Sequence, residues 1–182
     1  MAYRILLLFV SFFLISFQAC DKKAVDESHA RNQNKEFGWK NNASVTDIPD
    51  FPVKGKLEGK EVQFQYINFE RWRGSADNVF NFSIVMPAQD CGFIDDFSGF
   101  TLINKEASIV QGEFVKASFS DDPKTYQAFF KNEGQKSTVE WHCALNIESI
   151  SEKSVTGKIA LFFNDEKKSW LAGKFEAIVC NN

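Results

Sequence analysis

Apolar and polar residues alternate along much of this chain after residue 50, and this period of two restricts what the chain can fold into. The alternation runs through five stretches, at 62–66, 80–86, 141–148, 155–161 and 171–179. It places apolar side chains on one face of a strand and polar side chains on the other. Turn-forming residues separate the stretches, and no run of ten residues shows a helical stripe. The sequence therefore predicts an all-β domain, a single antiparallel β-sandwich or barrel of eight to nine strands.

This domain is expected to span residues 51–182, with residues 20–50 before it as a flexible tether. The stretch from residue 21 to 42 is mostly polar, so it buries too little apolar surface to offset the entropy cost of ordering. Prolines 49 and 52 mark the boundary. The isolated Phe37-Gly38-Trp39 leaves an alternative open, in which this part of the tether docks on the domain.

The N-terminal residues carry a different signal. An apolar run at 5–17 follows Arg4. It is shorter than the roughly 20 residues that a membrane-spanning helix needs, and it has the length of a signal-peptide core. Phe17-Gln18-Ala19-Cys20 and the charged residues after it resemble the lipobox of bacterial lipoproteins. The resemblance implies that residues 1–19 are a signal peptide and that Cys20 carries palmitate-type acyl chains.

The same resemblance places the mature protein outside the cytoplasm. It would be anchored by lipid in the cell envelope, with the outer membrane preferred over the inner one. Phe17 stands where the family usually has leucine, so an ordinary cleaved signal peptide with an incidental cysteine is the alternative.

Three cysteines remain after Cys20, and an exported domain favours a disulfide between two of them. Cys143 shares its parity with apolar residues in the middle of a strand, which predicts a buried thiol. Cys180 has the opposite parity, and Cys91 lies in a Pro/Gly-containing loop. These positions favour a Cys91–Cys180 bridge, with Cys91–Cys143 as the alternative. Residues 172–180 also resemble the closing strand of small secreted β-sandwich lipoproteins of unknown function, which often pair a final cysteine with one after an early strand.

The pattern apolar-x-Gly-Lys-apolar recurs at glycines 55, 157 and 173. Glycine inside a strand indicates a bend, a bulge or the close approach of a neighbour. We interpret the repeat as sheet curvature with solvated lysines on the outer face. A lysine row that binds an anion is the alternative.

Motifs that would indicate catalysis are lacking. His142 and Cys143 are zinc-type ligands, but neighbours on a strand point to opposite faces, and no Cys-x2-Cys spacing occurs. The acidic pairs at 95–96, 121–122 and 165–166 do not have the spacing of a calcium loop. Hydrolase and phosphate-binding motifs are absent. We therefore expect no enzyme, no metal and no cofactor. With a net charge of −3 and no basic stripe, nucleic acid is not an expected partner either.

The remaining expectation is a binding module at the cell envelope or surface, whose ligand is a host or envelope protein or a polysaccharide. Its contacts are expected in loops at 95–99, 121–124 and 164–169, because loops on a rigid β scaffold commonly bind ligands. Phe97 and Trp170 are the expected anchors, unless they fold inward as core. The alternative function is a periplasmic carrier or assembly factor that holds an apolar ligand among the 20 phenylalanines.

Overall fold

The computed structural model describes residues 36–72, 76–92, 99–105, 108–132 and 135–180. The chain from Phe37 onward forms one compact unit. The expected signal peptide, Cys20 and the first half of the expected tether lie outside the described residues, and so does Phe97. Among the described residues, no helix is long and apolar enough to cross a bilayer.

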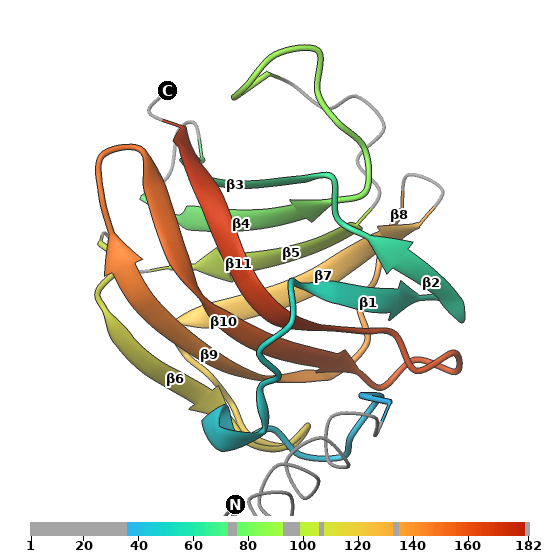
Figure 1. The fold of residues 1–182 in the computed structure, drawn as a ribbon. Helices are drawn as coiled ribbons and strands as arrows, with labels where there is room; N and C mark the ends of the chain where they lie inside the picture. Colours follow the sequence, from blue (N-terminus) through green and yellow to red (C-terminus); the bar gives the residue numbers. More distant parts are fainter. Residues whose placement is uncertain (1–35, 73–75, 93–98, 106–107, 133–134, 181–182) are drawn as a thin grey trace, which may run out of the picture. The chain divides into compact units, whose positions relative to one another are not determined.

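Eleven strands form a single sheet (Figure 1). The strands are β1 (Lys54–Leu57), β2 (Lys60–Gln63), β3 (Tyr66–Arg71), β4 (Asn78–Ser83), β5 (Gly99–Asn104), β6 (Gly112–Lys116), β7 (Tyr126–Asn132), β8 (Gln135–Lys136), β9 (Trp141–Ile150), β10 (Ser154–Phe163) and β11 (Trp170–Cys180). Their order across the sheet is β6-β9-β10-β11-β3-β4-β5-β7-β8, and the β1–β2 hairpin pairs with β11. The β11–β3 pair is parallel, and the other strand pairs are antiparallel.

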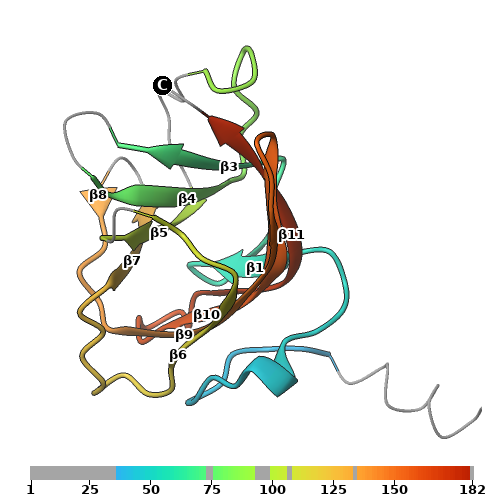
Figure 2. The ribbon, with the colours of Figure 1, turned by 90° about the vertical axis from the view of Figure 1, so that its left-hand side faces the viewer.

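The sheet curls into a half-barrel, with β3, β4, β5 and β7 facing β9, β10 and β11 across the interior (Figure 2). Its β6 and β7 regions come together, since the rings of Phe114 on β6 and Tyr126 on β7 have centroids 4.1 Å apart. The predicted all-β class is confirmed. One curled sheet, rather than two separate ones, makes the fold barrel-like.

Two details of the prediction were wrong, the strand count and the purely antiparallel pairing. The alternation at 62–66 is divided between β2 and β3 by a break at residues 64–65, and β8 is too short to leave a periodic signal. Two residues cannot display a period of two. The parallel pair joins residues 178–180 to residues 68–70. A local pattern contains no information about a pairing between segments so far apart in the chain.

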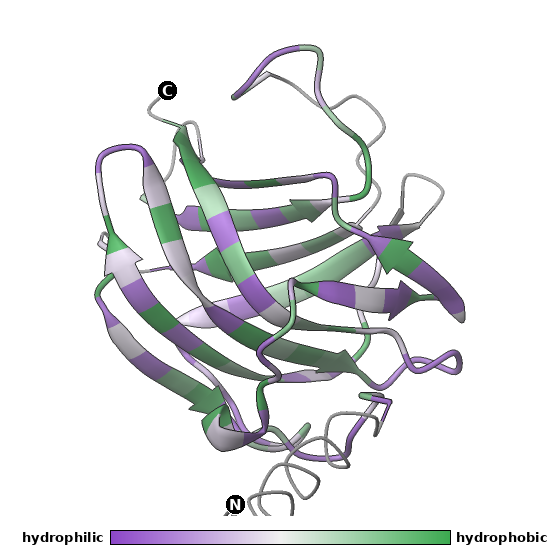
Figure 3. Ribbon diagram, viewed as in Figure 1, coloured by the Kyte–Doolittle hydropathy of each residue, from purple (hydrophilic) through white to green (hydrophobic). Residues whose placement is uncertain are grey.

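Phenylalanine rings fill the interior, and their strands alternate between polar and apolar residues (Figure 3). The Phe82 ring lies 5.6 Å from the Phe175 ring, measured between centroids. The Phe163 ring lies 5.7 Å from Phe100 and 5.1 Å from Phe130. All five side chains are buried. Edge-to-face and stacked aromatic pairs of this kind stabilise a core beyond the area that they bury.

A second layer covers the outer face of β9, β10 and β11. It consists of residues Phe37–Ile48, which we call the strap and which contain a short 3-10 helix at Val45–Asp47. Ala43 and Ile48 of the strap are buried in one apolar cluster with residues of those strands. The strap is therefore not a free tether, and the alternative, in which the Phe37-Gly38-Trp39 segment docks on the domain, is the one that agrees with this packing.

The disulfide prediction is confirmed. Cys91 and Cys180 are bridged, and Cys143 is a buried free thiol. The parity of Cys143 was the useful signal, because its side chain points into the core from the middle of β9. A disulfide between residues 89 positions apart indicates an oxidising, extracytoplasmic compartment.

Candidate binding surface around Trp39

Small side chains form an apolar strip on the outer face of the sheet. Ala160 of β10 lies directly opposite Ala144 of β9 and Ala172 of β11, and all three are buried. Large side chains follow at the next register position, where Phe162 lies between His142 and Trp170. Because alanine projects little from the sheet, another segment can approach the strands closely here. The strap occupies this place.

Hydrogen bonds fix the strap over the strip. The indole Nε1 of Trp39 donates to the carbonyl oxygen of Phe163 over 2.8 Å. The Nε2 of His142 lies 3.0 Å from the carbonyl oxygen of Lys40, so this nitrogen carries the proton and donates. The Phe37 ring completes the contact, with its centroid 5.4 Å from that of Trp170.

Trp39 is only half-buried, although its ring is held on several sides. The Phe119 ring stacks on it with centroids 5.9 Å apart and an interplanar angle of 18°. The Lys168 ammonium lies 4.2 Å from the centroid of the Trp39 ring, which is a cation–π contact. With its Nε1 bond to the sheet, the indole is fixed in one orientation while part of it faces solvent.

Phe119 is in turn positioned by the loop after β6. The Nζ of Lys116 donates to the carbonyl oxygens of Ser118 at 2.7 Å and Phe119 at 2.9 Å. Asp121 accepts from the N–H and the hydroxyl of Ser118, each at 2.9 Å, and these bonds lower the pKa of the Asp121 carboxyl. Burial lowers the pKa of the Lys116 ammonium. The loop therefore holds the Phe119 ring through its own backbone.

One of the three loops that the sequence nominated, at 164–169, reaches this surface, and a second, at 121–124, begins two residues after a residue of it. The loop at 164–169 contributes Lys168, whereas the contact near the loop at 121–124 is made by Phe119, which lies outside the predicted range. Phe119 and Lys168 are far apart in the sequence, and Trp39 contacts both. Of the third loop, at 95–99, residues 95–98 lie outside the described residues. We call Trp39, Phe119 and Lys168 the Trp39 surface.

The prediction that Trp170 is an exposed binding anchor was wrong. Its side chain is 9% exposed and packs among Phe37, Phe162 and the alanine strip, so the alternative of an inward core residue holds. The reason is the strap, which covers the face of β11 that alternation assigned to solvent. Phe97 is outside the described residues, and its role as an anchor stays a prediction.

His142 and Cys143 lie on opposite faces of β9, as expected. His142 is buried against the Phe162 ring, with centroids 4.8 Å apart, under the strap. Its pKa is lowered, mainly by burial. Cys143 is in the interior, where burial strongly raises the pKa of its thiol. Within the described part of the chain, no group of three His, Cys, Asp or Glu side chains has a geometry that would hold a metal ion.

The lysines of the Gly-Lys repeats are on the outer face and in two cases share a partner. Lys158 and Lys174 are directly opposite each other on β10 and β11. Their ammonium groups lie 2.6 Å and 3.2 Å from the same Oδ1 of Asp50. This arrangement lowers the pKa of Asp50 and raises the pKa of Lys158. An open pocket of about 360 Å³ adjoins them, lined by Pro52, Glu148 and Gly157 among others. The carboxylate of Asp50 is thus the anion that this lysine pair contacts.

Sequence reasoning missed the central residue of this surface. Trp39 was considered only as part of a segment that could dock on the domain and not as a binding residue, and Phe119 was not singled out. The available signal was the Phe37-Gly38-Trp39 cluster, whose aromatic residues in a polar stretch had left docking open as an alternative. Comparison of the chain with protein families, curated proteins and solved structures finds no match.

Proposed function

We propose that this chain is a non-catalytic, extracytoplasmic binding module that recognises a protein partner through the Trp39 surface. The observation that carries the proposal is the half-exposed indole of Trp39, which is held between Phe119 and Lys168 and hydrogen-bonded to the sheet. Tryptophan is enriched at the centres of protein interfaces, where a few residues supply most of the binding free energy.

Preorganisation is the physical advantage of this geometry. A side chain that is already fixed loses little rotamer entropy when a partner binds, so more of the contact energy appears as affinity. Charged residues adjoin the two partners of Trp39 in the sequence: Asp121 and Asp122 follow Phe119, and Glu166 and Lys167 precede Lys168. An apolar centre with a charged rim is the usual composition of a protein interface.

The packed interior supports this proposal over a carrier. The positions where an apolar ligand would lie contain phenylalanine rings that contact one another, including Phe82, Phe100 and Phe163. A close-packed interior has little space for a lipid-sized ligand.

Attachment to a membrane through acyl chains on Cys20 is part of the proposal, and it rests on the lipobox-like residues 17–20. Two or three acyl chains give a stable anchor, at about 0.8 kcal/mol for each buried CH2. Because the compact unit starts at Phe37, only residues 21–36 separate it from Cys20. Covalent geometry limits that reach to about 55 Å.

Site-specific photocrosslinking in intact cells tests the proposal. A benzophenone amino acid is introduced singly at the exposed positions Ser120 and Lys167, next in sequence to Phe119 and Lys168, and at the exposed Glu113 of β6 as a control outside the Trp39 surface. We expect protein adducts from the first two positions and not from Glu113. The adducts should disappear when Phe119→Ala is added, because that change removes the ring that supports Trp39.

A second variant, Trp39→Phe, keeps an aromatic ring but loses the Nε1 donor, and it should give reduced adduct yields. Thermal unfolding of each purified variant shows whether the domain is still folded. Adducts that form equally from Glu113, or that persist at full yield in folded Phe119→Ala, would contradict the proposed surface.

A further inference from the structure

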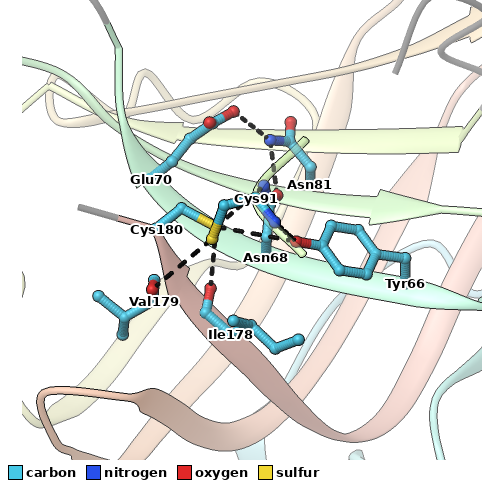
Figure 4. The surroundings of a disulfide bond; sticks show 8 residues. All are labelled: Tyr66, Asn68, Glu70, Asn81, Cys91, Ile178, Val179 and Cys180. Atoms are coloured by element: carbon cyan, nitrogen blue, oxygen red, sulfur yellow. Dashed lines mark hydrogen bonds between the residues drawn. A yellow bond between two sulfur atoms is a disulfide. The ribbon is translucent and has the colours of Figure 1, made fainter. Parts of the chain in front are cut away.

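The Cys91–Cys180 disulfide has two unlike ends (Figure 4). Cys91 is half-buried in the loop after β4, whereas Cys180 at the end of β11 is 3% exposed. Cys91 also has a φ of 61°, in the left-handed region that side chains with a Cβ rarely adopt. An attacking group from solvent therefore reaches the sulfur of Cys91 more readily than that of Cys180.

Two hydrogen-bond donors point at the buried sulfur. The Tyr66 hydroxyl lies 3.7 Å from the Sγ of Cys180, and the Asn68 Nδ2 lies 3.8 Å from it. The Cys180 Sγ also lies 4.0 Å from the carbonyl oxygen of Ile178, and the Cys91 Sγ lies 3.9 Å from that of Val179. Within the part of the chain that the structure describes, both of these donors are directed at Cys180, whereas the polar neighbour of the Cys91 sulfur is an acceptor.

The direction of each donor is set by its other bond. The N–H of Cys91 donates to the Tyr66 oxygen over 2.7 Å, so the hydroxyl keeps its own proton for the sulfur. The Asn81 Nδ2 donates to the Oδ1 of Asn68 over 2.8 Å, which turns the Nδ2 of Asn68 toward Cys180. Asn81 is held in place by Glu70, whose Oε1 accepts from the same nitrogen at 2.8 Å.

From this asymmetry we infer that the disulfide is a site of thiol exchange with a small monothiol of the glutathione class, and that Cys91 accepts the incoming sulfur. The thiolate of the reagent attacks the Sγ of Cys91, and a new S–S bond forms there. The Cys91–Cys180 bond breaks, and its electron pair leaves on the Sγ of Cys180. The donors from Tyr66 and Asn68 stabilise that thiolate as it forms.

The products are a mixed disulfide on Cys91 and a thiolate on Cys180. The reagent's sulfur and the Cys91 sulfur are joined in a disulfide, Cys180 is reduced, and no further oxidant is required. A donor-stabilised leaving thiolate accelerates exchange at the other sulfur. Exchange would also detach the described part of the loop, residues 84–92, from β11, because the bridge joins the two.

The experiment uses purified full-length protein under native conditions. Glutathione is added for a short time, free thiols are then blocked with iodoacetamide, and peptides are mapped by mass spectrometry. We expect glutathione on Cys91 and carbamidomethyl on Cys180. The second-order rate should fall about three- to tenfold in Tyr66→Phe and in Asn68→Asp, because each loses one donor to the developing charge.

Tyr126→Phe is the matched control. It removes a tyrosine hydroxyl that lies 3.4 Å from the Asn104 Nδ2, away from the disulfide. Its exchange rate should equal that of the wild type. Glutathione on Cys180, or unchanged rates in both donor variants, would overturn the inference. An equal decrease in all three variants would overturn it as well, since it would show that exchange follows general opening of the domain.

Discussion

His142 is the residue through which mild acid should act on this fold. Its ring is fully buried between Phe119 and Phe162, and it holds the strap through the Lys40 carbonyl. Among the described residues, its Nδ1 has no hydrogen-bond partner. Burial lowers the pKa of His142, and the nearby Lys116 ammonium adds to this, while the Lys40 carbonyl and Asp121 act in the opposite direction.

A pH dependence of stability follows from that lowered pKa. In the unfolded chain the pKa of His142 is about 6.5. Below that pH, His142 is protonated in the unfolded state while it stays neutral in the folded state, because its folded pKa is lower. The contribution of neutral His142 to the free energy of unfolding is complete above about pH 6.5. It is lost as the pH falls toward the folded pKa, at no more than about 1.4 kcal/mol per pH unit. Urea unfolding between about pH 7.5 and 5.5 should show this loss, and His142→Gln should reduce it.

The carboxyl groups of Asp50 and Asp121 do not contribute to the change in stability between pH 7.5 and 5.5. The pKa values of Asp50 and Asp121 are lowered from 3.8, so their contributions are present above about pH 4 and are lost only at lower pH. An equal loss of stability in the wild type and in His142→Gln between pH 7.5 and 5.5 would show that other groups bind the protons.

Trp170 gives a second test at the residue scale. Because it is 9% exposed in the cluster beneath the strap, Trp170→Ala should lower the free energy of unfolding by about 3–5 kcal/mol. Trp72 is 39% exposed, and Trp72→Ala should change stability by only about 0.5 kcal/mol. Urea titration of both variants makes the comparison. Similar small losses in the two would mean that Trp170 is not a core residue.

Among the elements, the strands predicted best were the long ones with clear alternation. β9, β10 and β11 begin within one residue of their predicted starts. β4 and β5 are buried along their whole length, on both faces, so a pattern that assumes one wet face could not bound them. The order of the strap was not predicted for a related reason. Its few apolar residues cannot offset the entropy cost of ordering by themselves, and their packing on the alanine strip is a tertiary contact that the local sequence does not reveal.

The bulge where β9 pairs with β10 allows a test at the element scale, and Glu148 of β9 is its extra residue. The register against β9 shifts between Thr156 and Gly157, and a Cβ on Gly157 would lie 2.3 Å from the carbonyl oxygen of Asn146. That contact is with backbone, so Gly157→Ala should destabilise the protein by about 1–3 kcal/mol. Gly38 in the strap has nothing within 4 Å of such a Cβ, and Gly38→Ala should be nearly neutral. Thermal unfolding distinguishes them, and equal melting temperatures would contradict a close approach at the bulge.

The anchor belongs to the scale of the whole molecule. If Cys20 carries the acyl chains, Cys20→Ala should move the protein from the detergent phase to the aqueous phase on phase partitioning. Cys143→Ser is a control, because Cys143 is buried within β9 and should not affect partitioning. Retention of Cys20→Ala in the detergent phase would reject the lipid anchor and leave the Trp39 surface to be judged by its own experiment.

The place of β11 in the sheet determines when the molecule can fold. β11 pairs with β10 along one edge, and along the other with β1 near its start and β3 near its end. It therefore joins the β3-to-β8 half of the sheet to the β6-β9-β10 half (Figure 1). All ten other strands precede it in the chain. Before residues 170–180 have been synthesised, the two halves of the sheet have no strand between them. The complete sheet can therefore form only after β11 is available.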